Sequence, residues 1–178
     1  MIKLKDLLSE DLFGTSLKLK PHETLMVKSV VAFMMDKYGF NAKIIVKKKD
    51  KVGMIGDISL NSNSVDGNKF YLHFNPNQSY KGIIQAMIHE LTHVKQVSKG
   101  ELLPNKDYTA IVWKGKEYIN VKEYGKLMKS DVASYKKLPW EIEAESNMSG
   151  LYSSFIASKY WKGLKGKDET MDFIIDNI

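Results

Sequence analysis

Two histidines four positions apart, with a glutamate directly after the first, constrain this chain more than any other feature. They are His89, Glu90 and His93, in the stretch MIHELTHVKQ. Apolar residues at helical spacing surround them, namely Ile84, Met87, Ile88, Leu91 and Val94. We therefore predict a helix from Tyr80 to about Gly100, capped by the preceding NPNQS segment. Residues four apart share a helix face, so both imidazoles need polar partners on that face.

A zinc ion is one such partner, because zinc binds imidazoles that converge on it from fixed directions. His89 and His93 can both reach a single ion from this face. Glu90 projects beside the first histidine, where it can hold a water molecule at the metal and take its proton. The alternative is an ordinary pair of hydrogen-bonded helix histidines that binds no metal.

A catalytic zinc site also needs a third protein ligand and one open position. The chain has four histidines and no cysteine, and no histidine follows His93. The candidates that remain are carboxylates, and LPWEIEAESN offers Glu141, Glu143 and Glu145 at the start of a predicted helix. Glu141 and Glu145 are four apart and share a face, whereas Glu143 points elsewhere. The spacing alone leaves both Glu141 and Glu145 open.

HELTH and EIEAE together resemble the gluzincin metallopeptidases, zincins whose third zinc ligand is a glutamate. The resemblance implies that Glu141 is this ligand and that Ala144 lets the two helices approach closely. It also implies that Glu145 hydrogen-bonds a ligand histidine, although the clan often has aspartate there. HELTHVKQ, VWKGKEY and LPWEIEAE are similar to small phage-encoded predicted metallopeptidases as well, over about residues 70–155.

We expect an α+β, zincin-like single domain over residues 1–178, with 1–20 as an extension and 163–178 as a C-terminal tail. A small twisted sheet would pack on an N-terminal helix and on the histidine helix, and a C-terminal helix would carry Glu141. Periodicity and Pro/Gly positions predict these other elements: a helix over 22–40, strands over 42–48, 54–60 and 69–75 with a hairpin loop at 61–68, a hairpin over 109–121 turning at 114–116, a short helix over 121–128, a long helix over 140–161 and a short one in the tail.

Other polar and aromatic residues are candidates for supporting roles. His73 lies on the strand before the histidine helix; at a sheet edge it could line a substrate cleft, and otherwise it is a surface or hydrogen-bonded residue. A donor to the developing oxyanion is also required, and spacing does not choose among the tyrosines. The available ones are Tyr108, Tyr124, Tyr135 and Tyr152. We expect His22 to be structural, and Trp113 and Trp140 to be core or hairpin anchors.

Composition limits the possible functions. The absence of cysteine excludes disulfides, thiolate metal sites and a cysteine nucleophile. The net charge is +6, yet every basic residue is lysine, which weakens the case for specific nucleic-acid recognition. The N-terminus lacks a signal-peptide core and no run is long enough to span a membrane. We expect a cytoplasmic protein with no membrane partner, in the host cytoplasm if it is phage-encoded.

The predicted function is a zinc-dependent endopeptidase that acts on peptide or protein substrates, with Zn²⁺ as cofactor and Glu90 as general base. One alternative is a catalytically inactive zinc-binding protein with a regulatory or interaction role, because it would keep the same ligands. A second, less supported alternative is a lysine-rich polyanion-binding protein with incidental histidines.

Overall fold

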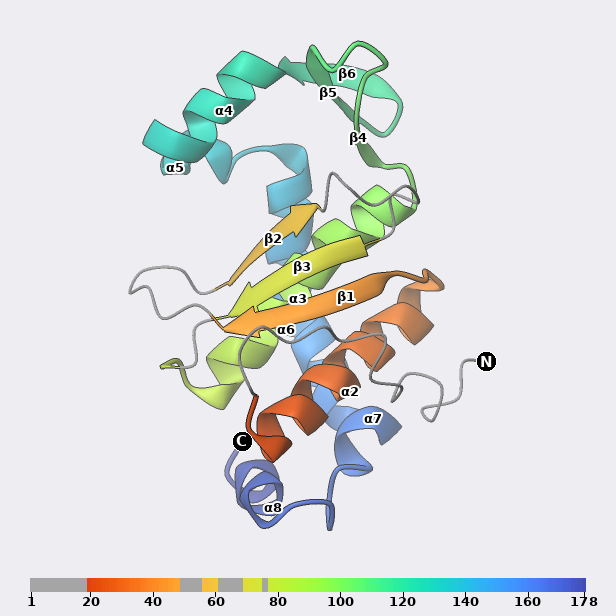
Figure 1. The fold of residues 1–178 in the computed structure, drawn as a ribbon, viewed down its shortest axis with the longest axis vertical. Helices are drawn as coiled ribbons and strands as arrows, with labels where there is room; N and C mark the ends of the chain where they lie inside the picture. Colours follow the sequence, from red (N-terminus) through yellow and green to blue (C-terminus); the bar gives the residue numbers. More distant parts are fainter. Residues whose placement is uncertain (1–18, 49–55, 61–68, 75–76) are drawn as a thin grey trace.

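The part of the chain that the structure describes combines helices with two small three-stranded sheets, as predicted for an α+β protein (Figure 1). The computed structural model describes residues 19–48, 56–60, 69–74 and 77–178. Most of the expected N-terminal extension and the expected hairpin loop at 61–68 lie outside these ranges. No helix within the described ranges has both the length and the apolar character needed to cross a membrane.

The first sheet has the strand order β1-β3-β2, formed by Lys43–Lys48, Lys69–Phe74 and Gly56–Leu60. β1 runs parallel to β3, and β2 runs antiparallel to it. Alternate residues of a strand face one side of a sheet. Accordingly, a buried patch forms where Ile44 pairs with Phe70 and Val46 pairs with Leu72. This apolar face packs on helices.

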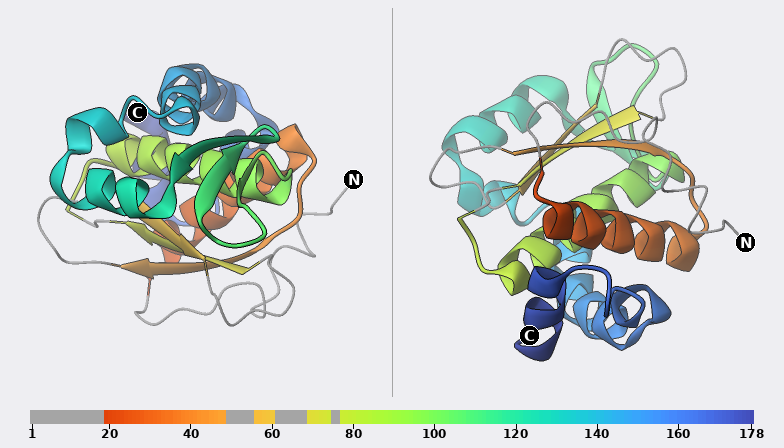
Figure 2. Two further views of the ribbon diagram at one scale, coloured as in Figure 1. Left: turned by 90° about the horizontal axis from the view of Figure 1, so that it is seen from above. Right: turned by 60° about the horizontal axis from the view of Figure 1, so that its bottom comes forward.

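Helices α2 (Pro21–Tyr38) and α3 (Tyr80–Ser98) contribute to the same hydrophobic core as this sheet. Both predicted helices are confirmed, with α2 ending at Gly39 in a left-handed conformation (φ 60°). Ser79 caps α3, because its hydroxyl accepts a hydrogen bond from the Gly82 amide at 3.1 Å. The left view of Figure 2 shows the sheet on one side of α3 and helix α6 (Pro139–Ala157) on the other.

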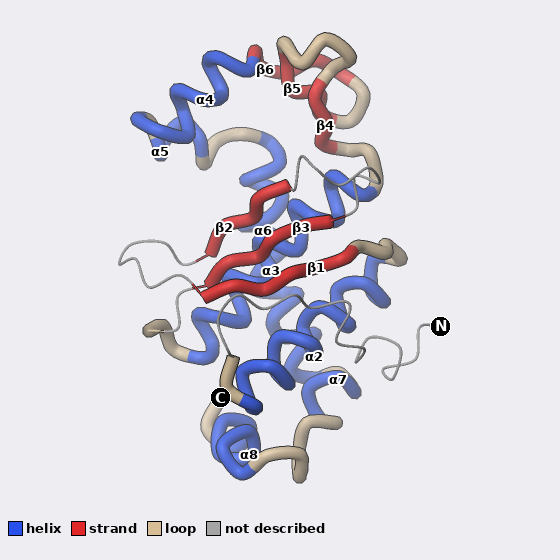
Figure 3. Tube along the Cα trace, in the orientation of Figure 1, coloured by secondary structure: helices blue, strands red, loops and turns tan. Residues whose placement is uncertain are grey.

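The second sheet, of order β4-β5-β6, lies at one end of the molecule (Figure 3). Its strands span Leu102–Pro104, Ala110–Trp113 and Lys116–Asn120. The predicted hairpin turn is confirmed, since Lys114 and Gly115 have positive φ angles of 47° and 83°. β4 was not predicted, because three residues carry no readable alternation. Helices α4 (Val121–Ser130) and α5 (Val132–Tyr135) follow.

The C-terminal region differs from the prediction in two ways. The expected helix over 140–161 is interrupted at Ser158, whose backbone is extended and whose hydroxyl caps α7 (Lys159–Lys162). This turn brings Trp161 into the core, where it is 2% exposed. The expected tail contains the predicted short helix, α8 (Glu169–Asp176). This helix is part of the folded domain, because Met171 and Ile174 are buried in the same core.

Candidate metal centre

His89 and His93 form the centre of the site, one turn apart on α3. Their rings are nearly perpendicular, at 83° with centroids 4.9 Å apart, and their Nε2 atoms approach to 3.3 Å. Their side chains are 19% and 13% exposed. The buried apolar stripe of α3 fixes this orientation, because Ile88, Leu91 and Val94 are inaccessible to solvent.

Glu141 approaches the two histidines from the first turn of α6. Pro139 begins that helix, where its missing amide hydrogen costs nothing. The two oxygens of the Glu141 carboxylate lie 3.4 Å from Nε2 of His89 and 3.3 Å from Nε2 of His93. The structure therefore brings together the three residues that were predicted as zinc ligands, although they lie on two helices far apart in the sequence.

The geometry and chemistry of this trio fit a zinc ion. Ligand atoms of the three residues all lie within 4.8 Å of one another. A tetrahedral ion with bonds of about 2.0–2.1 Å separates its ligand atoms by about 3.3–3.4 Å, and the two Nε2 atoms are 3.3 Å apart. Oε1 of Glu141 is buried and accepts no hydrogen bond from any residue in the described ranges, so a cation there would satisfy it. Two imidazoles and a carboxylate also leave one coordination position open for chemistry.

The charges around Glu141 keep its carboxyl group ionised, which is the form that binds a cation. Burial acts to raise the pKa of this carboxyl group, but His89, His93 and the Tyr135 hydroxyl outweigh it and lower the pKa to about 2. Glu141 is therefore an anion at neutral pH. Burial acts to lower the pKa of His93, yet Glu141, Gln96 and Glu90 together raise it. A metal ion that binds here must displace any proton on that imidazole.

Gln96 contacts the site and was not predicted to do so. It lies three residues after His93 on α3 and is 0% exposed. Its Oε1 lies 2.8 Å from Nδ1 of His93, and its Nε2 donates to the Trp140 carbonyl at 3.1 Å. The signal in the sequence was the spacing of three from His93, which places the two side chains on one face.

The three glutamates at the start of α6 have different environments. Glu145 was expected to hydrogen-bond a ligand histidine. Its carboxylate lies 3.6 Å from Nδ1 of His89, within ion-pair distance but beyond hydrogen-bond range, and its side chain is 70% exposed. Glu143 points elsewhere, as predicted, because it accepts from Lys95 at 3.1 Å and from Lys114 at 2.7 Å. Ala144 is completely buried, as expected where α3 and α6 approach closely.

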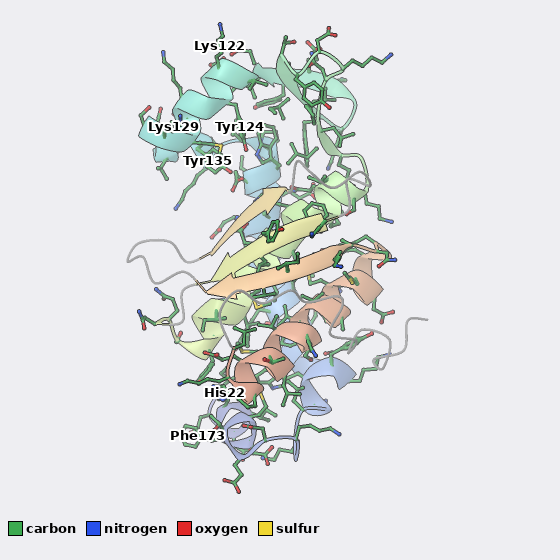
Figure 4. All side chains as sticks on the ribbon, viewed as in Figure 1. His22, Lys122, Tyr124, Lys129, Tyr135 and Phe173 are labelled. Atoms are coloured by element: carbon green, nitrogen blue, oxygen red, sulfur yellow. The ribbon has the colours of Figure 1, made fainter. Side chains whose placement is uncertain are left out.

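Among the candidate tyrosines, Tyr135 is the one whose hydroxyl lowers the pKa of Glu141. Burial raises the pKa of Tyr135, and Tyr124 and Glu141 raise it further, so its hydroxyl stays protonated at neutral pH. The two tyrosine rings lie 6.0 Å apart, beside the start of α6 (Figure 4). Tyr108 is 75% exposed in a turn, and Tyr152 lies further along α6. Sequence reasoning could not select Tyr135, because the four-residue helix α5 that carries it was not predicted.

Several other predicted residues lie outside the trio. His73 is on β3, which is the central strand of the first sheet because β1 and β2 flank it, so the edge position at which it could line a substrate cleft is not the one it occupies. Pairing of substrate with the backbone of β3 is therefore excluded. His22, which was expected to be structural, is 8% exposed and its ring contacts Tyr80. Trp140 is 1% exposed and anchors the hairpin through Trp113, whose ring lies 6.0 Å away.

Comparisons with known proteins found no relative of this chain. No protein-family model matches the chain, and neither a curated protein nor a solved structure matches it.

Proposed function

We propose that this chain is a zinc-dependent peptidase of the zincin type, with His89, His93 and Glu141 as zinc ligands and Glu90 as general base. The observation that carries the proposal is the convergence of the three ligand side chains from α3 and α6 within 4.8 Å. If the two histidines only formed hydrogen bonds within α3, no buried glutamate from a second helix would be needed beside them. Burying the charged Glu141 carboxylate costs free energy unless a positive charge compensates it, and a bound zinc ion would do so.

The residues around the trio have positions suited to peptide hydrolysis. Bound zinc supplies Lewis-acid chemistry, polarising a carbonyl group and lowering the pKa of water toward neutrality. Glu90 directly follows His89 on α3 and is half-buried, and its charge contributes to the raised pKa of His93. In the proposed reaction its carboxylate takes the proton of the attacking water and delivers it to the leaving amine.

Tyr135 is the candidate oxyanion donor, because it is the tyrosine whose hydroxyl interacts with Glu141. Its hydroxyl is protonated at neutral pH and lies near Glu141, on the side of the site formed by α4 and α5. A preorganised donor of this kind stabilises the charge that develops on the carbonyl oxygen during attack. We assign that role to Tyr135 in the proposed mechanism.

The fold is consistent with the zincin proposal. α3 lies between the β1-β3-β2 sheet and α6, so one helix presents the histidines and the next layer presents the glutamate. Among the described strands, β2 lies at an edge of this sheet; it contacts α3 and runs antiparallel to β3. An extended substrate could pair with such an edge.

Two measurements on protein purified without chelators test the proposal. Elemental analysis should find about one zinc per chain in wild type and in Glu90→Gln, since Glu90 is not a ligand. A peptide library should be cleaved by wild type, and Glu90→Gln should be slower by about 10²–10⁴-fold. Equal turnover by both proteins, prepared in parallel to expose contaminating protease, would refute the role of Glu90.

The same measurements separate the alternatives. Bound zinc with no cleavage of any peptide would identify a catalytically inactive zinc-binding protein. No zinc even after it is added back would leave the histidines as ordinary helix residues and would favour polyanion binding. That last function predicts DNA retention that falls steeply with salt and does not depend on His89.

A further inference from the structure

Gln96 is an uncharged polar side chain enclosed completely within the protein, one turn after His93. A buried amide is costly unless its polar atoms are hydrogen-bonded, and here both ends are. One end faces Nδ1 of His93 at 2.8 Å, and the other faces the carbonyl oxygen of Trp140 at 3.1 Å. The amide therefore bridges α3 and α6 directly beside the ligand trio.

The chemistry of these partners fixes the orientation of the Gln96 amide and places a proton on Nδ1 of His93. A backbone carbonyl can only accept, so the amide nitrogen of Gln96 must face Trp140. The amide oxygen then faces His93, and at 2.8 Å it requires a proton on Nδ1. The opposite amide orientation would press two carbonyl oxygens together. Neutral His93 must consequently carry its proton on Nδ1 and keep a lone pair on Nε2, the atom that faces His89 and Glu141.

We infer that Gln96 is a positioning residue that selects the metal-binding tautomer of His93 and holds the start of α6 in register with α3. Trp140 directly precedes Glu141, so one amide fixes a histidine ligand and the backbone beside the glutamate ligand. The corresponding contact of His89 is longer and more exposed, since the Glu145 carboxylate lies 3.6 Å from its Nδ1 and the Glu145 side chain is 70% exposed. The effect of Gln96 on zinc affinity rests on the proposed metal-binding function. The effect of Gln96 on the tautomer of His93 does not, because that tautomer is a property of the metal-free chain.

Long-range ¹H–¹⁵N NMR of the metal-free protein at pH 9 reads the tautomer directly. Wild type should show His93 protonated on Nδ1. Gln96→Leu removes both hydrogen bonds and should show a mixture of tautomers, while Gln96→Glu keeps the acceptor and should retain the Nδ1 proton. Gln85→Leu, the same substitution earlier on α3, is the matched control and should behave as wild type.

Zinc affinity, measured by chelator competition on the same proteins, reports the consequence. Loss of a residue that orients a metal ligand costs about 10–100-fold in affinity, which we expect for Gln96→Leu. Gln96→Glu should recover part of this loss. If Gln96 were merely a packing residue, the two variants would lose affinity equally and the tautomer of His93 would not change.

The outcomes are distinguishable from failure of the proposed function. A wild-type His93 protonated on Nε2 would overturn the inference, even if Gln96→Leu proves unable to fold. An Nδ1 proton in a protein that binds no zinc would support the role of Gln96 in setting the tautomer, while refuting the zinc proposal.

Discussion

Replacement of Glu141 by glutamine tests the site most sharply, because it removes the charge and keeps the shape of the side chain. Glu141 is 6% exposed, and its carboxylate lies 3.3–3.4 Å from both histidine nitrogens. Glutamine can occupy the same space without leaving a cavity. A change in zinc binding would therefore report the lost ligand and not a disturbed helix.

The expected magnitude follows from the number of ligands. Structural zinc sites bind with about 10–16 kcal/mol shared among four ligands, so one ligand contributes about 3–4 kcal/mol, or about 10²–10³-fold in affinity. Zinc at about 100 times the wild-type dissociation constant stabilises wild type by about 2.7 kcal/mol. For a chain of this size, that raises the melting temperature by about 5–11 °C. Under the same conditions the variant gains at most about 0.4 kcal/mol, or about 1–2 °C.

Differential scanning calorimetry with and without zinc measures these shifts, and each protein serves as its own baseline. Glu145→Gln is the matched control on the same helix and should keep the full zinc shift, because its side chain is 70% exposed. Equal shifts in wild type and Glu141→Gln would refute Glu141 as a ligand. A shift lost in Glu145→Gln but kept in Glu141→Gln would transfer the ligand role to Glu145.

Two further substitutions test the surroundings of the trio. Tyr135→Phe should lower kcat by about 10²-fold with unchanged zinc content, because it removes the proposed oxyanion donor. Steady-state kinetics measure this change, with Tyr152→Phe as the control. A Tyr135→Phe variant with the kcat of wild type would contradict the role of Tyr135. Glu143→Gln should lower the free energy of unfolding by about 1–2 kcal/mol, because Glu143 is 21% exposed and accepts from two lysines. Urea unfolding should show this loss shrinking in high salt with no change in zinc content, and an identical urea midpoint would contradict it.

Local features of the site were readable from the sequence. The apolar period of residues 80–100 predicted α3, and the spacing of His89 and His93 placed both on one face of it. Both follow from helix geometry, which depends only on neighbours within about one turn. The contact between His93 and Gln96 has the same local origin and was available in principle, but its importance depends on the second bond to Trp140 from another helix.

The choice between the glutamates belongs to the tertiary structure. Helical spacing treats Glu141 and Glu145 alike, yet the first is 6% exposed against both histidines and the second lies at the surface. Tyr135 could not be selected either, because its position depends on how α5 folds back toward α6.

By itself, the sequence determined the elements that repeat with a period: the histidine face of α3, the core helices and the strands of the central sheet. Only the tertiary structure decided which carboxylate meets the histidines, which tyrosine stands beside it and which amide joins the two helices. The physical reason is that backbone hydrogen bonding sets a side chain's direction within one element. Contacts between elements depend instead on where α3 and α6 cross, and that crossing is set by the packing of the whole core.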